Sequence, residues 1–304
     1  MEKRTSEKEK GPKETPDSAN AVPVNPATPQ SRTERETDLA NLTNGAMAPL
    51  WREILRHIPE RGIFDAHSHI GEDLDGRGMS AAGMRKRQDA AGVTRSIVFP
   101  LNDPAAAEDF SGPNDILWEA YGEFPEHFVP FFRLNPHNDY DREFERCVER
   151  GFVGLKLHPT SQNFDLDDKR AVRLFTMAAE ADLPVIIHAG FGMGRIVEPL
   201  LPTVEANPDL RLLLGHAAFV EVLEAVKAFA PHPNVLFETS VARAAEVYTL
   251  LTNLDPSRVV FGSDIPYGDL PSTLYAVVAS AKEAGLTEDE LAMILSSNIR
   301  RWFP

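Results

Sequence analysis

The chain has 304 residues, of which 42% are hydrophobic and 25% are charged, a composition typical of folded globular proteins. A formal net charge of -15 argues against broad binding to nucleic acid or to anionic membranes, because both need a cationic surface. Cys147 is the single cysteine, which excludes an intrachain disulfide and cysteine-based metal clusters, and no apolar run approaches the roughly 18 residues that span a bilayer.

Residues 1–45 differ in composition from the rest of the chain. They are rich in Glu, Lys, Pro, Thr, Ser and Asn and contain no aromatic residue. Such a segment cannot bury enough apolar surface to offset the entropy lost on ordering. It also lacks the apolar centre of a secretory signal and the acid-poor composition of a mitochondrial presequence. We therefore expect a disordered tail over 1–45, a folded domain over 46–304 and a cytoplasmic protein.

The folded part alternates short apolar runs with longer segments of helical spacing. A helix is expected over 48–58, before the first run, and helical spacing recurs in 113–124, 167–182 and 287–303. The expected strands are 62–70, 96–102, 127–135, 152–158, 184–190, 211–218, 234–241 and 259–266.

Eight strands that alternate with helices predict an α/β protein of the (β/α)₈ TIM barrel type. A doubly wound open sheet also alternates strands and helices, but it usually carries a glycine-rich nucleotide loop after the first strand. Here the first strand instead contains the sequence Asp-Ala-His-Ser-His at 65–69. This difference favours the barrel.

The first expected strand carries two histidines, His67 and His69. Side chains alternate along a strand, so the two imidazoles should point to the same side, and the same alternation includes Asp65. Two imidazoles directed at one point form part of a metal site, although two exposed histidines at a strand end would give the same motif.

Four more polar residues follow or end other expected strands. The carboxyl ends of all strands in a parallel barrel lie on one face, so these side chains should converge with the first histidine pair. A cluster of imidazoles and a carboxylate is costly to bury unless a cation satisfies it. These residues are His158, His188, His216 and Asp264.

The chain resembles the amidohydrolase superfamily, and in particular the amidohydrolase-related branch that includes aminocarboxymuconate-semialdehyde decarboxylase. The resemblance runs from about residue 60 to 303 through FDAHSHI, GLKLHP, PVIIHAG, LLLGHAAF and VVFGSDIPYG. It implies one divalent metal ion, with zinc expected first and manganese, iron or cobalt as alternatives. It assigns the metal to His67, His69, His188 and Asp264, and an acid/base role to His216.

Other residues at the strand ends are candidates for substrate contacts. His158 is expected to contact substrate or to assist the metal, and Arg133 and Glu238 could select polar or charged groups, although either could form a rim salt bridge. Lys156 shares the inward parity of His158 and, by analogy with two-metal members, could support a second ion after carboxylation.

These assignments predict a hydrolase that uses metal-bound hydroxide on an amide, lactone or ester carbonyl, with Asp264 accepting a proton and His216 polarising the carbonyl. The alternative is a non-oxidative decarboxylase of a small carboxylated ring or dienoate, for which Arg133 would pair with the substrate's carboxylate. A barrel that binds a ligand without chemistry is a third hypothesis, which the complete ligand set disfavours. The expected partner is a small molecule, with no nucleic acid or membrane, and a homodimer is left open.

Overall fold

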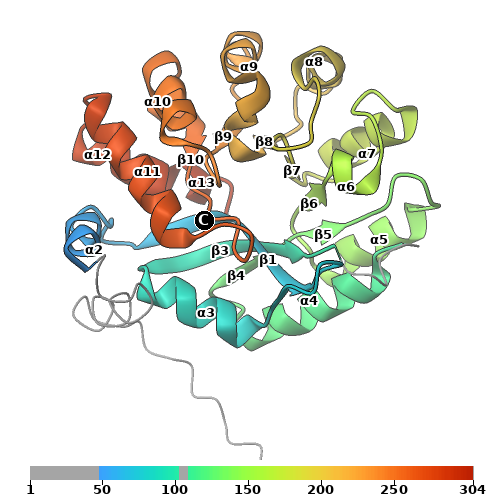
Figure 1. Ribbon diagram of the computed structural model, residues 1–304. Coiled ribbons are helices and arrows are strands. Elements are labelled where there is room, and N and C mark those ends of the chain that lie inside the picture. The colour runs from blue at the N-terminus through green and yellow to red at the C-terminus, as the bar shows by residue number, and fades with distance from the viewer. Residues whose placement is uncertain (1–47, 103–108, 304) are drawn as a thin grey trace, which may run out of the picture.

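The computed structural model describes residues 48–102 and 109–303. The predicted tail over 1–45 therefore lies outside the described residues. Strands form a closed parallel barrel and helices surround it, which confirms the predicted (β/α)₈ architecture (Figure 1). None of the helices in the described ranges combines the length and apolar character needed to cross a bilayer.

Every predicted strand segment contains a strand, although most strands are shorter than predicted. The strands are β1 Ile63–Glu72, β2 Gly78–Met79, β3 Val93–Pro100, β4 Phe128–Pro130, β5 Phe132–Arg133, β6 Leu155–Leu157, β7 Val185–Ile187, β8 Leu212–Leu214, β9 Val235–Glu238 and β10 Val259–Val260. Strand β2 is an addition that the sequence did not predict, and it pairs antiparallel with the end of β1 as a hairpin.

Helices follow the strands and cover the outside of the barrel. The larger ones are α2 Ala48–Leu55, α3 Ala81–Ala90, α4 Ser111–Glu123, α5 Asp141–Arg150, α7 Lys169–Glu180, α8 Val197–Ala206, α9 Val222–Phe229, α10 Ala244–Asn253 and α11 Leu270–Glu283. Shorter helical segments are α6 Pro159–Gln162, η2 Gly215–Glu221, η3 Pro256–Arg258, α12 Glu288–Ala292, η4 Met293–Ser297 and α13 Asn298–Arg300.

Two seams join the strands into a closed barrel. Strands β4 and β5 form one segment that changes partners, because Phe131 N–H donates to Val98 O on β3 and Phe132 N–H donates to Gly154 O before β6. At the other seam, β1 pairs with the segment after β10: Asp264 N–H donates to His67 O at 2.7 Å. The second seam therefore holds three predicted metal ligands, His67 and His69 on β1 and Asp264 in the segment after β10.

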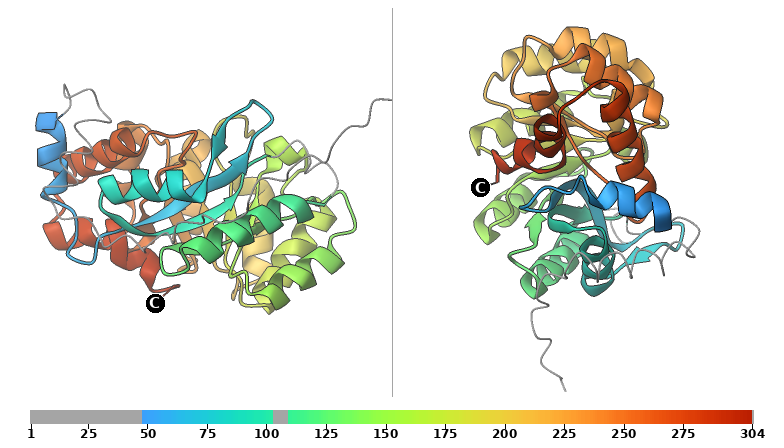
Figure 2. Two further views of the ribbon diagram at one scale, coloured as in Figure 1. Left: turned by 90° about the horizontal axis from the view of Figure 1, so that it is seen from below. Right: turned by 90° about the vertical axis from the view of Figure 1, so that its left-hand side faces the viewer.

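The inside of the barrel is filled by apolar side chains rather than by solvent. Phe64, Phe99 and Phe131 belong to this buried cluster, and Phe303 from the C-terminal segment packs against Phe64 and Phe131 with ring centroids 6.2 and 5.8 Å away. The C-terminus and the β1–β2 hairpin lie at opposite ends of the barrel (Figure 2, left). The polar cluster thus faces the hairpin end, above an apolar core.

The prediction that Asp65 shares the orientation of His67 is wrong. The β1–β3 register shifts between Asp65 and Ser68, as at a β-bulge, so the alternation of side chains is interrupted there. The Asp65 carboxylate accepts hydrogen bonds from Gln88 Nε2 on α3 and from Ser263 N–H. Asp65 therefore fixes the seam from the helix side and is no part of the histidine cluster.

Cys147 is fully buried on α5, and its thiol donates to Glu143 Oε1 at 3.2 Å. Burial raises the pKa of the thiol, and the nearby Glu143 charge adds to this effect, so little thiolate forms at neutral pH. We expect a disulfide reagent such as dithionitrobenzoate to label no thiol in the native protein and one thiol after denaturation. Stoichiometric labelling of the native protein within minutes would contradict this.

Candidate metal centre and cavity

Three side chains converge at the seam between β1 and the end of β10. Nε2 of His67 and Nε2 of His69 lie 3.2 and 3.0 Å from the same atom, Asp264 Oδ1. All three residues are buried, and their ligand atoms lie within 4.8 Å of one another. Two imidazole nitrogens and a carboxylate oxygen in this arrangement are suited to a divalent cation.

The backbone at Asp264 is held in an unusual conformation. Its φ of 59° lies in the left-handed region, which is costly for a residue with a side chain. Gly262, two residues earlier, is packed so closely that an added Cβ would lie 1.9 Å from Glu238 Oε1. Close packing and the hydrogen bond to His67 O together maintain this conformation, which directs the Asp264 carboxylate to the histidines.

Glu238 supports the histidine cluster from below. Its Oε2 accepts from Nδ1 of His67 at 2.7 Å and from Ser240 Oγ at 2.8 Å, and the side chain is fully buried. A carboxylate on Nδ1 keeps a proton on that nitrogen, so in the neutral ring the lone pair is on Nε2, the nitrogen that faces Asp264. Glu238 does not line the cavity, so its position suits orientation of His67 better than the predicted substrate contact.

His216 sits beside this cluster with its tautomer also fixed. Its φ is 58°, and Ala217 and Ala218 continue the left-handed conformation. Nδ1 of His216 lies 3.0 Å from the backbone oxygen of Ser240, so Nδ1 carries the proton and Nε2 carries the lone pair. The His216 ring lies 4.9 Å from the His67 ring and 4.5 Å from the His188 ring.

His188 and His158 stack on each other, with ring centroids 3.9 Å apart and an interplanar angle of 9°. Nε2 of His188 donates to Phe191 O at 2.8 Å, which leaves Nδ1 with the lone pair. His188 is not part of the compact group of His67, His69 and Asp264, but it lines the same cavity. The role of His188 as the fourth metal ligand therefore remains a prediction.

Burial sets the protonation states of these groups. Desolvation lowers the pKa of His69 to about 3, of His188 to about 2 and of His216 to about 4. Burial alone would raise the pKa of Asp264, but the charge of His67 and the hydrogen bonds from the two histidines hold it well below its usual value. Burial and the charge of Lys156 lower the pKa of His67, but the charges of Glu238 and Asp264 outweigh them and raise it, so a cation at Nε2 would compete with a proton there. The other imidazoles are neutral and Asp264 is ionised, which are the forms that bind a metal, so the residues fit a divalent cation.

Lys156 places a buried ammonium group in the same cluster. Its Nζ lies 3.3 Å from His67 Nε2 and 4.5 Å from the centroid of the Phe99 ring, and the side chain is fully buried. Desolvation lowers its pKa to about 7, even though the charges of Asp264 and Glu238 act in the opposite direction. A bound anion would therefore favour the charged ammonium form.

Arg133 lies outside the cavity, contrary to the simplest expectation for a substrate contact. Its guanidinium donates to Pro100 O at 3.1 Å and to Asn102 Oδ1 at 2.7 Å, and the side chain is fully buried. Asn102 itself lines the cavity. Arg133 can thus influence a ligand through Asn102, whereas direct pairing with a substrate carboxylate would need a rearrangement.

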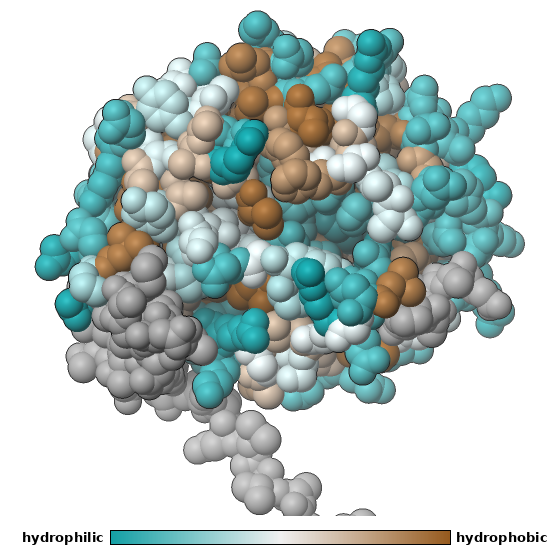
Figure 3. All heavy atoms as spheres, in the orientation of Figure 1, coloured by the Kyte–Doolittle hydropathy of each residue, from teal (hydrophilic) through white to brown (hydrophobic). Residues whose placement is uncertain are grey.

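The cluster forms the floor of a cavity of about 400 Å³ on the hairpin end of the barrel. The surface of this face is hollowed near its centre, with hydrophilic and hydrophobic residues intermixed around the hollow (Figure 3). Phe191, Phe219 and Tyr267 contribute aromatic walls, and the Tyr267 ring lies 5.1 Å from the His69 ring. The remaining lining residues are Asp73, Asp75, Asn102, Val241 and the histidines, lysine and aspartate described above.

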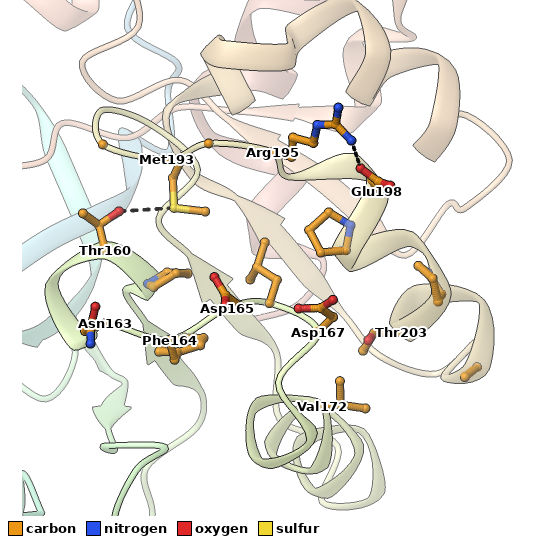
Figure 4. A pocket seen from close by; sticks show the side chains of 17 residues that line it. Thr160, Asn163, Phe164, Asp165, Asp167, Val172, Met193, Arg195, Glu198 and Thr203 are labelled. Carbon is orange, nitrogen blue, oxygen red and sulfur yellow. Dashed lines mark hydrogen bonds and ion pairs between the residues drawn. The ribbon is translucent and has the colours of Figure 1, made fainter.

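A second, larger cleft of about 1090 Å³ lies between the loop after α6 and the start of α8 (Figure 4). Thr160 Oγ1 contacts Met193 Sδ at 3.4 Å across it, and Arg195 pairs with Glu198 at its edge. Neither the predicted metal ligands nor His216 line this cleft. The smaller cavity therefore remains the candidate site.

A parallel barrel with a histidine and aspartate cluster at the carboxyl ends of its strands defines a class of metal-dependent enzymes. The chain belongs to the amidohydrolase family, whose sequence model matches residues 64–304. No curated protein matches the sequence significantly. Membership of the family agrees with the resemblance inferred from the motifs.

Several solved structures share the fold at low sequence identity. The chain is similar to 2,6-dihydroxybenzoate decarboxylase complexed with 2,6-dihydroxybenzoate, with a TM-score of 0.62 and 16% identity over 80% of this chain and 99% of that chain. A dihydroxybenzoic acid decarboxylase from Polaromonas sp. JS666, with bound manganese and 2-nitroresorcinol, gives a TM-score of 0.60 and 17% identity, over 80% and 97% of the two chains. A probable 2-pyrone-4,6-dicarboxylic acid hydrolase from Acinetobacter baumannii, with citric acid bound, gives 0.59 and 12%, over 80% and 99%.

Proposed function

We propose that the protein is a metal-dependent, non-oxidative decarboxylase of a small carboxylated ring that bears a hydroxyl group. The observation that carries the proposal is the buried Lys156 ammonium beside His67, on the floor of an aromatic-walled cavity. An ammonium group favours an anionic ligand, and aromatic walls favour a planar one. The carboxylated six-membered rings in the names of the similar enzymes have both properties.

His67, His69, His188 and Asp264 would hold the metal in this proposal. When bound, a divalent cation supplies Lewis-acid stabilisation of negative charge on the substrate's oxygens. Zinc and manganese both suit imidazole and carboxylate ligands, and the Polaromonas enzyme contains manganese. These two ions are therefore the ones to load first.

Two side chains of the cavity would bind the substrate and transfer its proton. Lys156 pairs with the substrate carboxylate. His216, whose lone pair is on Nε2, takes a proton from the ring hydroxyl and passes it to the ring carbon that carries the carboxylate. The bond to the carboxyl group then breaks, carbon dioxide leaves, and the electron pair returns to the ring oxygen, which takes a proton from solvent.

Hydrolysis of a ring lactone is the second candidate. It is supported by the similarity to the probable 2-pyrone-4,6-dicarboxylic acid hydrolase and by the neutral His216, which could accept a proton from an attacking water. The two reactions share the ligand set and the preference for a carboxylated ring. They differ in whether carbon dioxide is released.

A substrate panel separates the two reactions. We expect manganese- or zinc-loaded protein to release carbon dioxide from at least one hydroxybenzoate in a set that also contains 2-pyrone-4,6-dicarboxylate. Released carbon dioxide and ring absorbance would be followed together, with chelator-treated protein as the control. Loss of the pyrone absorbance without carbon dioxide would favour the hydrolase, and turnover of no member of the set would count against the decarboxylase.

A further inference from the structure

Asn102 follows strand β3 and lines the cavity, and its position is fixed by three hydrogen bonds. Its side-chain Oδ1 accepts from Arg133 Nη2 at 2.7 Å and from Ser161 Oγ at 3.1 Å. Its backbone oxygen accepts from Leu74 N–H of the β1–β2 hairpin at 3.0 Å. Arg133 is itself fully buried and held by Pro100 O, so the group that orients Asn102 is rigid.

The chemistry of these partners sets which end of the amide faces the ligand. A guanidinium group donates hydrogen bonds and accepts none, so the atom of Asn102 that faces Arg133 must be the oxygen. The Nδ2 group, with its two hydrogens, is therefore on the other side. Within the described residues no group accepts a hydrogen bond from Nδ2. Because Asn102 lines the cavity, Nδ2 is available to a ligand there.

Ser161, which donates to Asn102, also orients a second hydrogen-bond donor, His158. Its backbone N–H donates to His158 Nδ1 at 3.2 Å, which leaves Nε2 of His158 as the nitrogen that carries the proton. His158 also lines the cavity, as does Lys156 two residues before it. Asn102, Lys156 and His158 thus supply three hydrogen-bond donors from the ends of β3 and β6.

We infer that Asn102 is a specificity-determining residue whose Nδ2 donates to a second carboxylate on the ring of the substrate. Arg133 and Ser161 act as positioning residues that set the direction of this donor. The inference rests on the proposed function only in that the cavity accepts a carboxylated ring. It gives Arg133 an indirect contact with the ligand, through Asn102, although its own guanidinium does not reach the cavity.

Two unreactive probes test this inference without turnover. Benzoate carries one carboxylate, and isophthalate carries a second on the same ring. We expect the manganese-loaded protein to bind isophthalate roughly 10-fold or more tightly than benzoate in calorimetric titrations, the range for a hydrogen bond to a charged group. Equal affinity for the two probes would overturn the inference.

Substitution of Asn102 tests whether the preference for isophthalate over benzoate depends on this side chain. In Asn102→Asp, one carboxylate oxygen keeps the bonds from Arg133 and Ser161, while the other repels the second carboxylate of the probe. We expect this variant to lose the preference for isophthalate. Asn102→Ala, which removes the donor and adds no charge, should lose it as well while its affinity for benzoate changes little.

A charge control and an independent readout complete the test. Asn138→Asp adds the same charge on a partly exposed loop residue that does not line the cavity, and it should keep the preference. Preference retained in both Asn102 variants would refute the role of Asn102. Because binding is measured without reaction, an intact preference in a protein that releases no carbon dioxide would reject the decarboxylase and leave this inference standing.

Discussion

Replacing His67 and His69 together with alanine is expected to abolish both metal binding and activity. Each residue places Nε2 within 3.2 Å of Asp264 Oδ1, so the double variant loses two of the three groups that converge at the seam. With one carboxylate and no first-strand imidazole, little affinity for zinc or manganese should remain. Elemental analysis of the purified protein should find well below one equivalent of metal.

The fold should survive this change with reduced stability. The two rings contact Phe99, with centroids 4.9 and 4.4 Å away, and their removal leaves space above the apolar core of the barrel. It also leaves Asp264 and Glu238 buried with fewer partners, and breaking such buried pairs costs about 3–5 kcal/mol. We expect a lower melting temperature and an unchanged circular dichroism spectrum at 20 °C.

A matched control removes two histidines elsewhere. His137 and His232 do not line the cavity, and His137→Ala combined with His232→Ala changes the composition by the same amount. This control should bind one equivalent of metal. Full metal occupancy in the His67 and His69 variant would show that the metal centre has been assigned to the wrong residues.

The arrangement of the main site elements could be predicted because it follows from strand geometry. His67 and His69 are two residues apart on one strand, and Asp264 follows the last strand, so the parallel barrel places all three on one face. Asp65 could not be placed in this way, because the register shift before Ser68 depends on contacts with α3 and the seam. Alternation holds only where a strand is regular.

The sequence pattern could not predict the roles of the polar residues that lie below the cavity. Arg133 and Glu238 end strands as predicted, but whether such a side chain enters a cavity or turns beneath it depends on packing. Gly262 leaves room for the Glu238 carboxylate, so a glycine at this position could have suggested that Glu238 turns beneath the cavity. Asn102 and Ser240 were missed, because a polar residue after a strand is common and only its hydrogen-bond partners reveal its function.

His216→Asn is expected to lower turnover by roughly 10²- to 10⁴-fold, the usual loss when an acid or base group is removed. His216 is 5% exposed, and its Nδ1 proton is committed to Ser240 O, so Nε2 is the atom available to a substrate. An asparagine amide can replace the donor to Ser240 but has no group that exchanges a proton near neutral pH. The same substitution at His232, outside the cavity, is the control and should leave turnover unchanged.

Metal content measured on the same preparation decides what His216 does. His67 also belongs to a second compact group, with His216 and Glu238, but its Nδ1 is already bonded to Glu238, so this group is better explained as support for the rings than as a second cation site. We therefore expect His216→Asn to retain one equivalent of metal while it loses turnover. Unchanged turnover would make His216 a histidine satisfied by a backbone carbonyl, with no role in proton transfer. Loss of the metal would instead make His216 a ligand, and the buried Lys156, 3.3 Å from His67 Nε2, would then be the side chain to test as the support of a second ion.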